Sequence, residues 1–189
     1  MRLNNLLAER KTAIVKKWFS LAIETYPPDT AKFLHRQKDP IANPVGRTIY
    51  RGLEELFDEL LNGIDYESAT DSLDPIIRIR AVQAYSPSQA TGFIFFLKKV
   101  IRENFHKEIF EEALLEELLT FESKIDELGL IAFNIYMKCR EKICDLKASE
   151  IKNRTFKAFE RAGLVKEMPE FEPDLKSIIN TPNEASNNS

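Results

Sequence analysis

Hydrophobic residues recur along this chain at steps of three and four, which is the period of helices that each bury one side. The first pattern predicts a helix that runs to about Glu24, where Pro27-Pro28 prevents its continuation and Asp29 can cap a short helical turn. We find no sustained period of two bounded by hairpin signals anywhere in the chain. The sequence therefore predicts an all-α protein.

The next helix has two alternative starts, Asp39-Pro40 and Asn43-Pro44, because each offers a capping side chain followed by a proline. Gly63 is its natural stop. Its apolar face consists of Ile49, Leu53, Leu56, Phe57, Leu60 and Leu61.

Two further start signals follow each other closely. Asp74-Pro75 predicts a helix from Pro75 to Tyr85, after a frayed turn over residues 65–72. Ser86-Pro87 with Gln89 forms a capping box and predicts a helix from Pro87 to about Glu103. The expected buried stripe of the first helix is Ile76, Ile79 and Val82, and that of the second is Ala90, Phe93, Ile94, Leu97, Val100 and Ile101.

A long helix is predicted over about residues 111–162, since an apolar seam keeps its register through Gly129. Gly163 fits the left-handed position that ends it. The seam alternates steps of four and three, as in a coiled coil. Its members, which we expect to form a dimer interface, are Leu114, Leu118, Phe121, Ile125, Leu128, Ala132, Ile135 and Cys139.

An unbroken helix of this extent would be roughly 75–80 Å long, whereas a compact chain of this size has a radius of gyration of roughly 16 Å. The helix must therefore project or bend, and projection would leave the seam for a second copy of the chain. We expect one helical domain over 1–163 and a proline-containing, largely disordered tail over 164–189.

Composition excludes few function classes. A net charge of −3 gives no overall attraction to nucleic acid. The basic run from Lys138 to Arg161 lacks the aromatic residues of a nucleic-acid platform. The apolar run from Ala90 to Leu97 is too short to span a membrane, and the N-terminus is not a signal peptide. We expect a cytoplasmic protein that binds no nucleic acid and whose two cysteines, Cys139 and Cys144, are free thiols.

Candidate catalytic chemistry is sparse. His35 and His106 have no second metal-binding side chain at ligand spacing, which favours a protein without haem or another cofactor. Phosphate loops, nucleophile elbows and zinc-protease motifs are absent from the sequence. We therefore expect a non-catalytic protein with no metal site.

Arginines near the helix starts are the remaining candidates. Arg47, Arg78 and Arg80 either join helices through ion pairs or contact an anion or a partner. Arg78, Arg80 and Tyr85, beside the corner at Ser86, are the candidate regulatory contacts.

Three strings, Asn43–Gly46, Ile79–Gln83 and Ser86–Ala90 continuing through Phe93–Lys98, resemble the RsbT co-antagonist RsbRD-type N-terminal domain. The resemblance covers about residues 5–145. It implies a bacterial stressosome-lineage module that is haem-free, globin-like and sensory, dimerises, and signals through its last helix. Relatives often carry a C-terminal sulfate-transporter/anti-sigma-antagonist domain, which we do not expect here.

Together these observations predict a homodimeric regulatory or adaptor domain of a stress-response pathway, with an unidentified protein partner. The alternative is a small-ligand or haem-binding sensor, in which Phe93 and Phe96 would enclose a globin-like pocket near His106 or His35.

Overall fold

The computed structural model describes residues 3–35, 43–83, 85–111 and 113–164. Every regular element in these ranges is a helix, which confirms the all-α class. The Asp39-Pro40 start lies outside the described residues. The chain divides into two units, Met1–Asp145 and Leu146–Ser189.

The N-terminal segment forms α1 (Leu3–Glu9) and α2 (Lys11–Ile23) instead of one predicted helix. Arg10 leaves the helical conformation between them, pairs with Glu108 at 3.1 Å and lies over the ring of Phe105. This long-range contact explains a break that the local pattern does not predict. The short turn at Asp29 is present as α3 (Pro28–Leu34).

Asn43 begins α4 (Pro44–Asn62), so the second of the two predicted starts is confirmed. Its side chain accepts the Gly46 N–H at 2.8 Å and donates to the Leu34 carbonyl at 2.9 Å. The predicted apolar face is buried, except that Leu61 is only half-buried. Gly63 ends the helix at a φ of 116°, as predicted.

The prediction of a helix start at Asp74-Pro75 is wrong. A single helix, α5 (Tyr66–Val82), is capped by Asp65 and passes through Pro75. A proline inside a helix removes one hydrogen bond, but burial of the neighbouring apolar side chains against α4 offsets that cost. Asp74 pairs with Arg78 instead of capping.

The longer α5 also changes its buried face. Val82 is 75% exposed and Ile79 is only half-buried, so of the predicted stripe only Ile76 is fully buried. The buried side chains are Ala69, Ser72, Leu73, Ile76, Ile77, Arg80 and Ala81.

Both hydrogen bonds of the predicted capping box at Ser86 and Gln89 are present. The helix that follows is divided into α6 (Pro87–Thr91), the 3₁₀ segment η1 (Gly92–Phe95) and α7 (Phe96–Asn104). All six members of its predicted stripe are buried.

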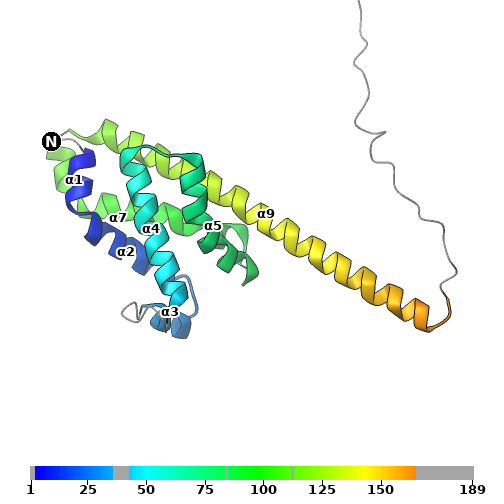
Figure 1. Ribbon diagram of the computed structural model, residues 1–189. Helices are drawn as coiled ribbons and strands as arrows, with labels where there is room; N and C mark the ends of the chain where they lie inside the picture. The colour runs from blue at the N-terminus through cyan, green and yellow to red at the C-terminus, as the bar shows by residue number, and fades with distance from the viewer. Residues whose placement is uncertain (1–2, 36–42, 84, 112, 165–189) are drawn as a thin grey trace, which may run out of the picture. The chain divides into compact units, whose positions relative to one another are not determined.

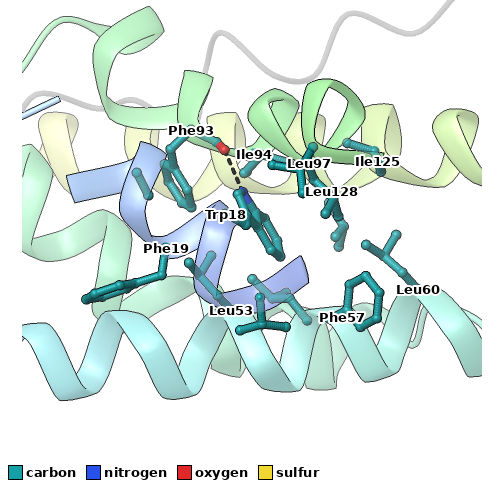
Figure 2. Packing of buried hydrophobic residues seen from close by; sticks show 14 of the residues in the cluster. Trp18, Phe19, Leu53, Phe57, Leu60, Phe93, Ile94, Leu97, Ile125 and Leu128 are labelled. Atoms are coloured by element: carbon teal, nitrogen blue, oxygen red, sulfur yellow. Dashed lines mark hydrogen bonds between the residues drawn. The ribbon is translucent and has the colours of Figure 1, made fainter. Parts of the chain in front are cut away.

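Trp18 of α2 occupies the centre of the core (Figure 2) and is fully buried. Its indole N–H donates to the Phe93 carbonyl of η1 at 2.8 Å. α2 packs against both α4 and α7, and α4 also packs against α5 (Figure 1). The indole therefore joins the 3₁₀ segment to the middle of the bundle.

α8 (His106–Glu111) precedes the long helix α9, which spans Leu115–Arg161 and begins four residues later than predicted. The helix passes through Gly129 as expected. A Cβ there would lie 2.4 Å from the Phe95 ring, so the glycine admits the close approach of η1.

Side chains of the predicted dimer seam pack inside the chain's own first unit. Leu114, Leu118, Phe121, Ile125, Leu128, Ala132 and Ile135 are at most 6% exposed, and Cys139 is half-buried. The seam has the predicted register, but α9 uses it to complete the intramolecular core. These residues therefore leave little surface for a second copy.

In the second unit, α9 ends as predicted. Gly163 has a φ of 66°, and the Leu164 N–H donates to the Phe159 carbonyl at 3.0 Å. This is the hydrogen bond of a Schellman motif. Among the described helices, none is both long enough and apolar enough to cross a membrane.

Replacing Asn43 by Ala should lower the free energy of unfolding by about 1–3 kcal/mol, because the helix loses its cap and the Leu34 carbonyl loses a buried donor. The control is Asp65→Ala, which removes an exposed cap and should cost about 1 kcal/mol or less. Urea denaturation of both variants tests the order, and an equal loss would contradict a joining role for Asn43.

Candidate functional site

The last turn of α5 places a buried arginine at the corner between α5 and α6. Arg80 is 0% exposed. Its Nη2 donates to the Ala22 carbonyl at the end of α2 at 2.9 Å, and its Nη1 donates to the Gln89 carbonyl of α6 at 3.0 Å. One guanidinium therefore joins three helices.

Three aromatic rings surround this guanidinium. Its central carbon lies 4.6 Å from the ring centroid of Phe93, 4.9 Å from that of Tyr26 and 5.6 Å from that of Tyr85. Each contact places the positive charge near the negative face of an aromatic ring. We call Arg80, Tyr26, Tyr85 and Phe93 the Arg80 cluster.

Arg80 has no carboxylate partner among the described residues; its contacts there are carbonyl oxygens and aromatic rings. Burial lowers the pKa of the Arg80 guanidinium, and the nearby Tyr26 and Tyr85 hydroxyls oppose that shift. An unpaired charge in the interior is costly, and removal from water alone costs several kcal/mol per ion. The cluster is consequently a buried centre of positive potential.

Two polar atoms of the cluster lack a hydrogen bond of normal geometry with any described residue. They are Nε of Arg80 and the hydroxyl oxygen of Tyr26, both hidden from solvent. Burial raises the pKa of the Tyr26 hydroxyl, and the charge on Arg80 opposes that rise. Buried polar groups are normally paired, so these two neighbouring groups are the most unusual feature of the first unit.

A surface cleft of about 580 Å³ lies over the cluster. Tyr26, Tyr85 and Gln89 form part of its wall, and all three contact Arg80. The rings of Tyr26 and Tyr85 meet edge to face at a centroid distance of 5.6 Å. These two rings therefore lie between the solvent-filled cleft and the buried guanidinium.

The corner is also tied to α9. The Tyr136 hydroxyl donates a hydrogen bond to the Tyr85 carbonyl, and Nη1 of Arg140 donates to the Ala81 carbonyl at 3.3 Å. Both bonds join α9 to backbone next to the cluster. A displacement of the corner backbone would therefore strain or break these two hydrogen bonds to α9.

The structure separates the three predicted contact residues. Arg80 and Tyr85 belong to the cluster, whereas Arg78 is exposed and pairs with Asp74, which raises the pKa of Arg78. Arg47 is exposed near the start of α4. Arg80 joins helices through hydrogen bonds to backbone carbonyls and not through the ion pairs that the sequence suggested.

Both histidines are exposed and lie apart from the cluster. His106 stacks on Phe110 and borders an apolar cleft of about 320 Å³ beside the Arg102–Glu122 ion pair. Phe93 does not line that cleft; it packs beside Trp18 instead. Phe96 and His35 are likewise not among the residues that line this cleft.

A further cleft, about 800 Å³, lies between α4 and α5 and is lined largely by acidic residues. Its inward carboxylates already have partners: Glu59 accepts from Ser68, and Glu55 accepts from Arg51 and Ser72. In the described ranges, no three His, Cys, Asp or Glu side chains are grouped as metal ligands.

The sequence did not indicate that Tyr26 and Phe93 contact Arg80, or that Tyr136 and Arg140 bond to the corner. They come from three separate segments, with Tyr136 and Arg140 one helical turn apart on α9, so no local spacing relates them to Arg80. One signal was available: Arg80 follows Leu73, Ile76 and Ile77 at helical spacing and thus falls on the apolar face of α5.

The fold and the site define an all-helical domain whose long last helix is hydrogen-bonded to a buried cationic corner. The family model of the RsbT co-antagonist protein rsbRD N-terminal domain matches residues 12–150, and the chain belongs to this family. Membership makes it a regulatory domain of stress signalling. Comparisons with curated proteins and with solved structures give no match.

Replacing Tyr136 by Phe should lower the free energy of unfolding by about 0.5–1.5 kcal/mol, because the Tyr85 carbonyl loses its donor. Amide hydrogen exchange should also quicken around residues 85–87. Tyr66→Phe, at a tyrosine that is 53% exposed, is the control and should change neither quantity. Unchanged exchange at the corner would show that the bond does not hold α9 to it.

Proposed function

We propose that this domain is a non-catalytic regulatory module that acts as a homodimer and passes its signal through α9. The observation that supports the proposal best is that α9 carries apolar side chains on two faces. One face completes the core, and the other bears Leu130, Phe133 and Met137, which are 68%, 43% and 38% exposed.

The spacing of these three residues, three and then four positions, puts them on one side of the helix. They alternate with the core residues Leu128, Ala132 and Ile135 along the same turns. Large apolar side chains grouped on a surface favour a protein contact. A second copy of the same helix would cover them symmetrically.

This proposal moves the dimer contact from the predicted seam to the opposite face. Leu114 to Ile135 of the seam are already packed within the chain, so an interface built from them would require the core to open. The second unit offers more apolar surface, since Ile151, Phe156 and Phe159 are 65%, 53% and 50% exposed.

The family supports the rest of the proposal. A stress-signalling domain acts by binding other proteins, so we propose a protein partner that contacts α9 and a cytoplasmic location. The bonds from Tyr136 and Arg140 to the corner supply a physical route from the first unit's interior to this helix. No residue is assigned a catalytic role.

The double variant Leu130→Asp with Phe133→Asp should convert the dimer to a monomer, with at least about a 100-fold rise in dissociation constant, because two carboxylates would be buried in an apolar contact. The helix content should be retained, since both positions are exposed. Sedimentation at micromolar concentration measures the change.

The matched control introduces the same two charges elsewhere, as Val82→Asp with Phe33→Asp; these side chains are 75% and 47% exposed. This control should remain dimeric. A wild-type monomer at micromolar concentration contradicts the proposal, and a dimeric Leu130/Phe133 variant would place the interface on another surface.

A further inference from the structure

We infer that the cleft over the Arg80 cluster is a binding site for a small monocarboxylate, recognised by Nε of Arg80 and the hydroxyl of Tyr26. The inference goes beyond the proposed dimer and stands without it. It rests on two observations. The buried guanidinium of Arg80 has an N–H donor, at Nε, without a hydrogen bond of normal geometry to a described residue, and its neighbours Tyr26 and Tyr85 line a cleft.

The first step is a count of donors. A guanidinium has five N–H groups. Two of them donate to the Ala22 and Gln89 carbonyls, one from each terminal nitrogen. The Nε–H is among those left, and a carboxylate characteristically binds an arginine through Nε and one terminal nitrogen together. Arg80 is thus held in place by two bonds, while its Nε faces the Tyr26 hydroxyl without a hydrogen bond of normal geometry to any described residue.

The second step concerns Tyr26. Its hydroxyl is buried beside the same guanidinium, whose charge and proximity oppose the rise in its pKa, but it makes no hydrogen bond of normal geometry to a described residue. The Tyr26 side chain also lines the cleft. As a donor it would complete the recognition of a carboxylate oxygen. A single carboxylate would therefore give both atoms, Nε of Arg80 and the Tyr26 hydroxyl, the well-oriented hydrogen bond that neither makes with a described residue.

The third step selects the charge and size of the ligand. The described part of the cluster holds one positive charge and no negative one. A monoanion neutralises it, whereas a dianion such as phosphate would leave a second charge against the rings of Tyr26, Tyr85 and Phe93. Entry requires the Tyr26 and Tyr85 rings to part, which favours a short apolar chain.

Binding would act on α9 through the corner. Tyr85 faces Arg80 with its ring and accepts the Tyr136 hydroxyl with its carbonyl. Movement of that ring on entry of the ligand therefore alters the backbone to which α9 is bonded. Slower amide exchange is expected near residues 85 and 136 once the carboxylate is bound.

The test is a titration of the full chain with sodium propionate at constant ionic strength, followed through the arginine Nε–H resonances and tyrosine ring signals by NMR. Propionate should shift the Arg80 Nε–H signal saturably. Propionamide, which has the same shape without the charge, should shift it at least about tenfold less at equal concentration. Inorganic phosphate should bind more weakly than propionate.

Two variants make the test specific. Tyr26→Phe keeps the ring and removes only a hydroxyl that makes no hydrogen bond of normal geometry to a described residue. It should therefore fold about as stably as the wild type and bind propionate about tenfold more weakly. Arg78→Gln removes an exposed arginine of the same helix and should bind normally. The Leu130→Asp/Phe133→Asp variant should also bind normally, which separates this site from dimerisation.

Three binding results would overturn the inference. They are equal shifts with propionate and propionamide, undiminished binding by Tyr26→Phe, and loss of the propionate response in Arg78→Gln, which would place the anion at the surface. A marked loss of stability in Tyr26→Phe would assign its hydroxyl a structural role and also overturn it.

Discussion

The buried guanidinium of Arg80 is the interaction on which the corner of this domain depends. It donates to carbonyls at the end of α2 and in α6 while belonging to α5 itself, so it fixes where three helices meet. Two carbonyl bonds and three aromatic rings compensate only part of the cost of burying the charge. The two carbonyl bonds make the corner a joint between helices. The part of the desolvation cost that is not compensated is the reason why an anion would be stabilised there.

α9 is hydrogen-bonded to the backbone of that corner. Tyr136 and Arg140 bond to the backbone on either side of it, and the residues between Leu118 and Ile135 complete the core. This part of α9, which belongs to the first unit, is therefore packed into that unit's core. Its other face, on the same turns, exposes the apolar side chains of Leu130, Phe133 and Met137.

Family membership and physical chemistry agree on the kind of protein this is. The family model covers most of the first unit and describes a regulatory domain. The structure adds a buried cationic corner that the family description does not mention. The histidines and acidic clefts are exposed or already paired, whereas the Arg80 cluster combines burial, charge and unpaired donors.

Local hydrogen bonding let the sequence by itself determine the helical class and several helix ends: Asn43 before α4, Gly63 after it, the Ser86 capping box and Gly163. Each depends on residues only three to six positions apart. Tertiary structure alone decided that α5 passes through Pro75, that Arg80 lies inside, and that the seam of α9 faces its own core. These outcomes depend on packing between segments distant in sequence, and a periodic pattern specifies which side of a helix is buried but not what buries it.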